Sequence, residues 1–329
     1  MMSNPDLVTL AGREAFSRIK DIAKEKGQPL HSVALRYVLE RFLHRLFSSQ
    51  DPGVERLFVH PRTNVSLDVS SVTLKGGMTL TFAEQVPVLE GRSTGDADLH
   101  LASFGGSMED YAAILAAGLA GPPASGPDDG VRFDVGAMRV ARDREERTGG
   151  TLVIPAQVGS LAIQIKTDVS FDARPMHAKA PVVDYPMVLP DAGIPAPVVR
   201  RVPYEFMVAD KFAAAIAYGI MNKRIRDYPD MRLVLGKGLV DRDFLAETMA
   251  ATVRFQGREL PETMAEAPAF SDEFARLQSA RWETERASRR YVVRESLPEI
   301  IAWLREDLEP VLQAARELED LPAWSSGPR

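Results

Sequence analysis

The segment LKGGMTLTFAEQVPVLEGRSTGDADLHL, residues 74–101, is the most informative part of the chain. It sets a Gly-Gly pair before a short helical run, followed by an arginine and two aspartates two residues apart. If residues 95–101 form a strand, Asp96 and Asp98 project from one face, because strand side chains alternate. Carboxylates this close repel unless a cation or proton lies between them. Mg²⁺ bound by carboxylates and substrate phosphates is the usual solution, so the segment favours nucleotide chemistry.

The bulk composition is typical of a globular protein and excludes several kinds of site. The chain has 329 residues, 45% of them hydrophobic, and a net charge of −6. This length predicts about two domains. The absence of cysteine excludes disulfides and cysteine-based zinc sites. The five histidines have no paired metal-ligand spacing, and the acidic balance argues against broad non-specific nucleic-acid binding.

The sequence shows no membrane span and no secretory signal, so we expect a cytoplasmic protein that does not contact membranes. No apolar run approaches the roughly 18 residues of a membrane span. The N-terminal residues lack a basic region followed by an apolar one, so we read no secretory signal.

Hydrophobic periodicity outlines the secondary structure. Residues 11–49 read as two helices, the first ended by Gly27 and Pro29. A section rich in strands follows, with a weak strand at 66–74, the Asp-x-Asp strand, a helix at 108–120, and strands at 131–141, 151–158 and 161–171. The Pro-rich residues 185–197 are expected to form a connector or short edge strand. Helices are predicted at 204–221, 226–237, 241–254, 271–294 and 297–318.

The change of pattern near residue 200 predicts a domain boundary. Residues 1–200 should form an α/β domain with two N-terminal helices, and residues 201–329 a helical domain. In the predicted strand 161–171, alternation puts Asp168 on the polar face, where it could supply a third carboxylate. The competing interpretation of these carboxylates is a solvated strand face, with Gly76 and Gly77 merely starting a helix.

A second group of charged residues lies in the helical part. Lys211 sits within an apolar helical stretch, where its ammonium must reach water or an anion. Lys223, Arg224 and Arg226 precede Asp227 near the end of that stretch. These cations could face phosphate, or they could complement the dipole at a helix C-terminus.

Taken in order, these motifs resemble the AbiEii/AbiGii family of nucleotidyltransferase toxins, within the DNA polymerase β-like superfamily. The matching pieces are LKGGMTL (74–80), RSTGDADL (92–99), KTDVSF (166–171), VADKFAAA (208–215) and NKRIRDYPDM (222–231). The chain departs from the family pattern at Ala97, at Arg226, where lysine is common, and at Met78. Because Met78 replaces a usual serine or threonine, any hydroxyl contact to a phosphate must come from Thr79 or be absent.

The resemblance implies an α+β fold: a polymerase β-like mixed sheet flanked by helices, followed by an α-helical C-terminal domain that completes the active site. It implies transfer from a nucleoside triphosphate with Mg²⁺ or Mn²⁺ held by Asp96, Asp98 and Asp168. It also implies catalytic roles for Lys211 and Asp227. The expected nucleotide-binding residues are Gly76, Gly77, Thr79, Arg92, Lys211, Arg224 and Arg226.

The resemblance further implies a toxin of a toxin–antitoxin or phage-defence system, controlled by an antitoxin of the winged-helix regulator kind. The expected acceptor is RNA, with the tRNA 3′ end foremost. Its basic surface could include Arg200, Arg201, Lys223, Arg224, Arg232 and Lys237, with arginines 281–290 as a further candidate or simply a solvated helix face. Two alternatives stay open: a nucleotide-sensing interaction protein without turnover, and transfer of the nucleotide to a protein hydroxyl.

Overall fold

The computed structural model describes residues 7–47, 57–85, 89, 91, 94–102, 104–124, 126–143, 149–288 and 292–318. The chain divides into two compact units. We call the first, Met1–Phe82 with Val86–Arg201, the sheet unit. The second, Ala83–Gln85 with Val202–Arg329, is the helical unit. Each unit is described separately.

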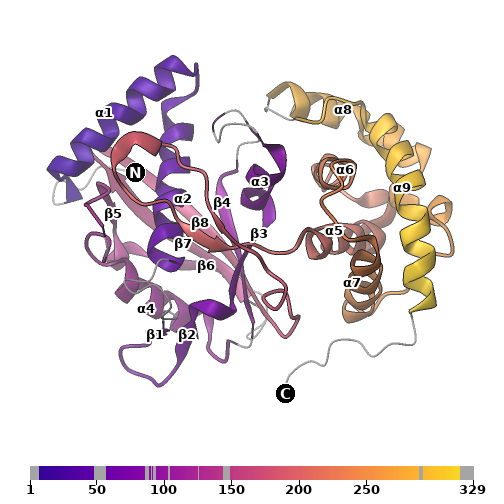
Figure 1. Ribbon diagram of the computed structural model, residues 1–329, viewed down its shortest axis with the longest axis horizontal. Helices are drawn as coiled ribbons and strands as arrows, with labels where there is room; N and C mark the ends of the chain where they lie inside the picture. Colours follow the sequence, from indigo (N-terminus) through magenta and orange to yellow (C-terminus); the bar gives the residue numbers. More distant parts are fainter. Residues whose placement is uncertain are drawn as a thin grey trace. The chain divides into compact units, whose positions relative to one another are not determined.

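A six-stranded mixed sheet organises the sheet unit (Figure 1). Its order is β3 (Val72–Lys75), β4 (Asp96–Ala102), β8 (Leu161–Asp172), β7 (Gly149–Val158) and β5 (Val131–Phe133), and β6 (Arg139–Asp143) also pairs with β7. Only the β4–β8 pair is parallel among these pairings. Two small antiparallel sheets accompany it: β1 (Leu57–Val59) with β2 (Ser66–Asp68), and β9 (Val182–Asp184) with β10 (Val198–Arg200).

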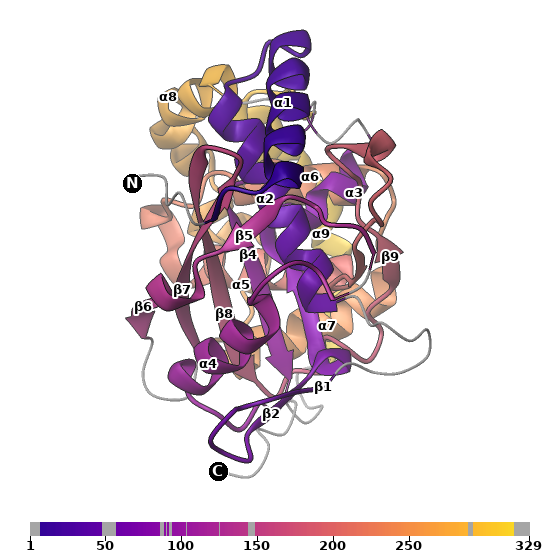
Figure 2. The ribbon, with the colours of Figure 1, turned by 90° about the vertical axis from the view of Figure 1, so that its left-hand side faces the viewer.

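One face of the large sheet packs on helices, and the other carries the polar side chains. Helices α1 (Leu10–Glu25), α2 (Leu30–Phe47) and α4 (Met108–Leu119) share one hydrophobic core with the strands (Figure 2). On β8, Ile163, Ile165 and Val169 enter this core, while Asp168 lies on the more open opposite face. The predicted alternation of this strand is therefore confirmed.

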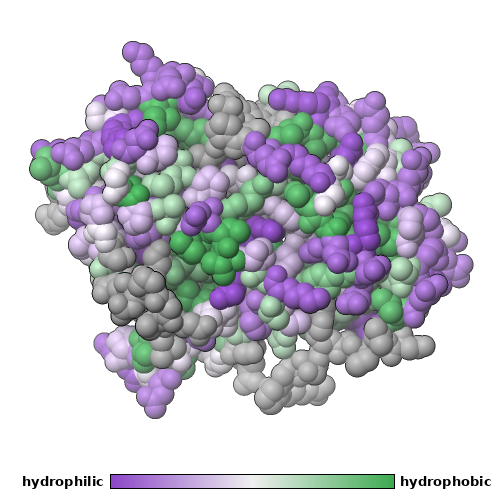
Figure 3. Space-filling view, in the orientation of Figure 1, coloured by the Kyte–Doolittle hydropathy of each residue, from purple (hydrophilic) through white to green (hydrophobic). Residues whose placement is uncertain are grey.

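The two predicted N-terminal helices are present as α1 and α2. The Thr9 hydroxyl oxygen caps α1 by accepting from the Gly12 amide at 3.0 Å. The outer face of α1 is hydrophilic, as the upper left of Figure 3 shows. Helix α2 is more deeply buried, and its Glu40 carboxylate accepts from the Val188 amide at 2.6 Å. This bond fixes the Pro-rich connector, which contains the 3₁₀ turn Pro190–Ala192 between β9 and β10.

The prediction of a single strand at 131–141 is wrong, because the chain leaves the sheet in the middle. Phe133 pairs with Ala156, and Arg139 pairs with Val153. The chain thus advances farther between these positions than its partner β7 does. The surplus residues form the 3₁₀ turn Val135–Ala137, after which β6 resumes the pairing.

The helical unit contains five long helices among its described residues. They are α5 (Tyr204–Tyr218), α6 (Asp227–Gly236), α7 (Arg242–Phe255), α8 (Asp272–Ser288) and α9 (Leu297–Glu317). Helix α5 ends earlier than predicted because Gly219, at φ +51°, turns the chain. The predicted end of α8 at residue 294 is also too late, because residues 292–294 are not helical and residues 289–291 lie outside the described part. No helix in the described ranges is long and apolar enough to cross a membrane.

Candidate active site

The two aspartates of the Asp-x-Asp motif share one face of β4. Asp96 and Asp98 are partly exposed, whereas Ala97 between them is fully buried. Because β4 runs parallel to β8, Asp98 lies opposite Asp168, and Asp96 lies opposite Lys166. All three predicted carboxylates therefore project from the same face of two adjacent strands, as strand alternation requires.

One row of paired residues crosses four strands at the level of Asp98. Lys75 on β3 pairs with Asp98, Asp98 pairs with Asp168 on β8, and Asp168 pairs with Thr151 on β7. We call these four residues the central row. Two acidic side chains thus stand side by side, with a lysine at one end and a threonine at the other. Antiparallel and parallel partners project to the same face, so the four side chains can act together.

Each carboxylate has its own local partner. The Asp168 Oδ1 atom accepts a hydrogen bond from the Thr151 hydroxyl. The Asp96 Oδ1 atom accepts from the Thr94 hydroxyl at 3.0 Å. The Asp98 carboxylate lies against Gly76, the first residue of the turn that follows β3. The Asp98 carboxylate thus lies toward β3, and the Asp168 carboxylate lies toward β7.

The chemistry of the donor set fits a divalent cation brought in with a triphosphate. Within the described ranges, no three His, Asp or Glu side chains are gathered so as to hold a metal ion by themselves. Mg²⁺, however, uses one or two carboxylates, water and substrate phosphates rather than a cage of protein groups. Asp98 and Asp168, opposite each other on parallel strands, provide such a pair.

The Gly-Gly turn joins β3 to α3 (Leu80–Glu84) through a 3₁₀ turn, Gly76–Thr79. Gly76 has φ +69°, and a Cβ atom there would lie 1.8 Å from Asp98 Oδ2. Only glycine satisfies both the backbone and the carboxylate. Met78 is fully buried, and the Thr79 hydroxyl donates to the Gly76 carbonyl at 2.7 Å. A phosphate contact from Thr79 would require that hydrogen bond to break.

In the helical unit, α5 and the start of α6 bring together the second predicted set. The Lys211 ammonium donates to Asp227 Oδ1 at 2.5 Å and to Asp230 Oδ2 at 2.9 Å. Arg224 Nε donates to Asp227 Oδ2 at 2.7 Å. Of the two partners considered for the Lys211 ammonium, water and an anion, the structure shows the anion: two carboxylates accept its hydrogen bonds.

The environment of Asp227 favours its charged form. Burial raises the pKa of this carboxyl, but the nearby charges of Lys211 and Arg224 and their hydrogen bonds outweigh it, so the pKa lies below its ordinary value of 3.8. Arg226 lies farther out, with its Nε atom 3.8 Å from Glu285 of α8. Arg92 lies outside the described residues.

Several cations expected to meet an acceptor have local partners. Arg232 pairs with Glu295 at 2.9 Å, and its guanidinium lies 4.1 Å from the Trp303 ring centroid. Lys237 donates to the Glu84 carbonyl at 3.1 Å. Arg286 pairs with Glu283. These contacts engage much of the basic surface that the sequence suggested.

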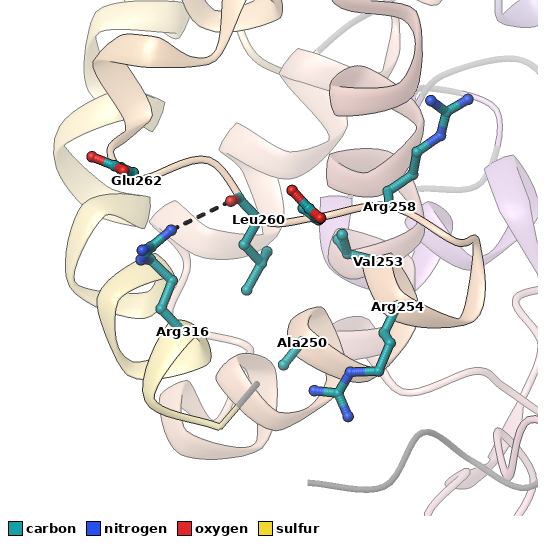
Figure 4. A pocket seen from close by; sticks show the side chains of 8 residues that line it. Ala250, Val253, Arg254, Arg258, Leu260, Glu262 and Arg316 are labelled. Atoms are coloured by element: carbon teal, nitrogen blue, oxygen red, sulfur yellow. Dashed lines mark hydrogen bonds between the residues drawn. The ribbon is translucent and has the colours of Figure 1, made fainter. Parts of the chain in front are cut away.

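A pocket elsewhere in the helical unit presents other arginines (Figure 4). It has a volume of about 430 Å³, with Ala250, Val253 and Leu260 as its apolar lining residues. Its charged lining residues are Arg254, Arg258, Arg316, Glu259 and Glu262. Arg254 donates to the Leu318 carbonyl at 3.0 Å, and Arg316 donates to the Pro261 carbonyl at 3.1 Å. Among the described residues, none of the three arginines forms an ion pair with a carboxylate. None of the predicted site residues lines this pocket.

Comparison with protein families gives a match over residues 62–308 to the family described as "Nucleotidyl transferase AbiEii toxin, Type IV TA system". The match covers most of the chain and includes every residue of both predicted sets. The chain belongs to the AbiEii family. It is therefore a nucleotidyltransferase and the toxin of a toxin–antitoxin system, which implies a cognate antitoxin.

Solved structures give a similar result for the fold. The nucleotidyltransferase toxin MenT4 from Mycobacterium tuberculosis H37Rv aligns with 14% identity and a TM-score of 0.51, covering 92% of this chain and 98% of that one. JHP933 from Helicobacter pylori aligns with 12% identity and a TM-score of 0.44, covering 87% and 93%. The MenT4 similarity supports the predicted α+β nucleotidyltransferase fold. The curated proteins include no match.

Sequence reasoning missed three residues that the geometry adds to the predicted sets. Thr151 orients Asp168, Asp230 shares Lys211 with Asp227, and Lys75 ends the central row. Asp230 had a local signal, because its three-residue spacing from Asp227 puts both on one side of a helix. Lys75 adjoins the Gly-Gly pair, and its significance depends on a strand pairing that the sequence does not display.

Proposed function

We propose that this AbiEii-family toxin transfers a nucleotide from a nucleoside triphosphate to an RNA acceptor, the tRNA 3′ end foremost, with Mg²⁺ or Mn²⁺. The observation that carries the proposal is the pairing of Asp98 with Asp168 beside the glycine turn. Two carboxylates and an open backbone are the elements that a metal-bound triphosphate needs. The choice of tRNA rests on the resemblance of the motifs to the family.

The sheet unit would supply the groups around the reacting phosphate. Asp98 and Asp168, with Asp96 on the same face, would hold the metal together with the substrate phosphates. The metal would make the attacking hydroxyl more acidic and neutralise charge on the leaving group. Gly76 and Gly77 would let phosphate oxygens approach the backbone. Asp168 would accept the proton of the acceptor hydroxyl. The acceptor oxygen then bonds to the α-phosphorus as the bond to the β-phosphate oxygen breaks, and pyrophosphate leaves.

The helical unit would supply cationic groups for the same reaction, and in this sense it would complete the active site. The Arg224 side chain is 58% exposed although its Nε atom is bonded to Asp227, so its outer nitrogens can contact phosphate. Arg226 would assist it. Lys211 and Asp227 would hold Arg224 in position, and a triphosphate contact from Lys211 would require exchange with a carboxylate.

The acceptor and partner parts of the proposal rest on charge and on family membership. Phosphates of an RNA would meet guanidinium groups, and Arg254, Arg258 and Arg316, which form no ion pair within the described part of the chain, line one pocket. We propose that the cognate antitoxin is a winged-helix regulator, that the pair acts in phage defence, and that the toxin works in the cytoplasm.

The test is incorporation of label from each of the four nucleoside triphosphates, labelled at the α-phosphate, into total cellular RNA and protein with Mg²⁺. We expect label in RNA, abolished in Asp96→Ala. Sequencing of tRNA 3′ ends after induced expression of the native chain and Asp98→Ala would identify the acceptor. Label in protein alone would establish transfer to a protein hydroxyl. Tight triphosphate binding with no transfer to RNA or protein would overturn the proposal in favour of a sensor.

A further inference from the structure

The Gly-Gly turn lacks a hydroxyl that is ready to bind phosphate. Met78 is fully buried in the core, and the Thr79 hydroxyl donates to the Gly76 carbonyl within the turn. The side chains of both residues after the glycines, Met78 and Thr79, are therefore buried in the protein. If a triphosphate docks here, as proposed above, its oxygens meet backbone N–H groups at the glycines, and any side-chain donor must come from another residue of the sheet unit.

Lys75 immediately precedes the turn, and its side chain crosses β4 to reach β8. Its Nζ atom donates to the Ser170 hydroxyl at 2.8 Å. Lys75 is on β3 and Ser170 is on β8, so the side chain must cross β4, which lies between them. Asp98 is the residue opposite Lys75 on that middle strand. The ammonium thus lies on the same sheet face as the predicted metal-binding carboxylates.

The contacts of this ammonium leave capacity for an anion. A lysine ammonium has three donors, and the Ser170 hydroxyl accepts from one of them. Among the described residues Lys75 has no carboxylate in an ion pair, in contrast to Lys211 with its two. The tether to Ser170 orders the side chain in advance, which lowers the entropy cost of binding a phosphate.

The charge balance of the face also calls for a cation. Asp96, Asp98 and Asp168 would repel a triphosphate unless positive groups accompany it. Lys166, opposite Asp96 on the same face, is exposed, and among the described residues no hydrogen bond orders its ammonium as Ser170 orders that of Lys75. An ordered lysine beside the glycine turn is better placed to contact phosphate than an exposed one whose rotamers are free.

We propose that Lys75 binds the triphosphate of the incoming nucleotide, in place of the hydroxyl that the Gly-Gly turn lacks. This inference rests on the proposed function. Ser170, two residues beyond Asp168 on β8, is then a positioning residue that orders the Lys75 side chain on the face of the carboxylates. A charge-assisted hydrogen bond between ammonium and phosphate oxygen is the interaction gained.

The experiment is calorimetric titration of the full chain with inorganic tripolyphosphate and Mg²⁺, which isolates phosphate contacts from base contacts. We expect Lys75→Met to weaken binding about tenfold or more, the range of one lost charge-assisted bond. Lys75→Arg should keep part of the affinity, and Ser170→Ala should lose about threefold through lost ordering. Lys166→Met removes the same charge from the same face and is the matched control, with an expected change under about threefold.

The outcomes separate this inference from the function on which it rests. If Lys75→Met binds tripolyphosphate as tightly as the native protein does, the role of Lys75 is overturned and the proposed function stays intact. Equal losses in Lys75→Met and Lys166→Met would overturn it too, because the effect would then be general electrostatics. Native protein that binds neither tripolyphosphate nor any nucleoside triphosphate would refute both. If Lys75→Met unfolds, the affinities of Lys75→Arg and Ser170→Ala for tripolyphosphate decide whether Lys75 binds phosphate. Native affinity in both variants would refute that role.

Discussion

The acidic residues of the two units are stabilised in different ways. In the sheet unit, Asp96 and Asp168 accept hydrogen bonds from threonine hydroxyls, and no ion pair among the described residues involves either. In the helical unit, Asp227 and Asp230 share Lys211. Hydroxyls orient a carboxylate without cancelling its charge, whereas an ammonium cancels it. The first arrangement can still attract a metal ion, and the second mainly holds its own helices together.

The largest effect is expected when the cation shared by Asp227 and Asp230, the Lys211 ammonium, is removed. Lys211→Met leaves Asp227 and Asp230 buried without their shared partner, so we expect a loss of about 3–5 kcal/mol in the free energy of unfolding. Urea denaturation measures it. Lys223→Met, at an exposed position, should change the value by less than about 0.5 kcal/mol. A loss under about 1 kcal/mol for Lys211→Met would show that the cluster is not structural.

The next largest effect is expected at the turn that faces Asp98. Gly76→Ala adds a Cβ atom where the Asp98 carboxylate lies and strains a backbone at φ +69°. We expect about 2–4 kcal/mol of destabilisation, of which the left-handed backbone accounts for roughly 1–2 kcal/mol. Gly27→Ala is matched in backbone, at φ +58°, but has nothing within 4 Å of the new atom. If the two variants melt alike and retain equal nucleotide transfer, Gly76 has no special relation to Asp98.

A smaller effect should follow removal of the hydroxyl that orients Asp168. Thr151→Val deletes the donor to the Asp168 Oδ1 atom, which should cost about 1 kcal/mol of stability. If Asp168 holds the metal, the Mg²⁺ concentration needed for half-maximal transfer should rise about tenfold or more, as for other residues that orient metal ligands. Titration of activity with Mg²⁺ measures this. An unchanged Mg²⁺ requirement would separate Asp168 from the metal.

The smallest effect is the loss of stability at low pH that follows from protonation of Asp227. The pKa of Asp227 is lower in the folded protein than in the unfolded chain, so the unfolded chain binds more protons at low pH. The stabilisation is complete well above pH 3.8 and is lost as the pH falls through the lowered pKa. Urea unfolding between pH 6 and pH 3 should show a steeper loss for the native chain than for Asp227→Asn. If the free energy of unfolding falls equally with pH in the native chain and in Asp227→Asn, the lowered pKa of Asp227 is contradicted.

Local patterns were sufficient for much of the fold. Apolar spacing predicted α1 and α2, and strand alternation predicted that Asp96 and Asp98 share a face. Both depend on residues a few positions apart, where the geometry of one element decides the outcome. The motifs also resembled the AbiEii family, which the family match confirmed.

Pairings between distant segments could not be derived from local pattern. The register that sets Asp98 beside Asp168, and Lys75 opposite Asp98, depends on how strands far apart in the chain align. The same limit explains the error at 131–141, where β7 fixes the point at which the chain leaves the sheet. The partners of Lys211 likewise come from the next helix, so its apolar surroundings in sequence gave no sign of them.

The central claim is that the carboxylates of the sheet face carry out nucleotidyl transfer. The most direct measurement is the initial rate of label transfer from α-labelled nucleoside triphosphates to RNA, comparing Asp98→Asn with Asp184→Asn, an exposed strand residue of the small β9–β10 sheet. We predict a fall of about a thousandfold or more for Asp98→Asn with an unchanged melting temperature, and a change under about twofold for Asp184→Asn. Asp98→Asn protein that is folded and transfers label within tenfold of the native rate would contradict the account.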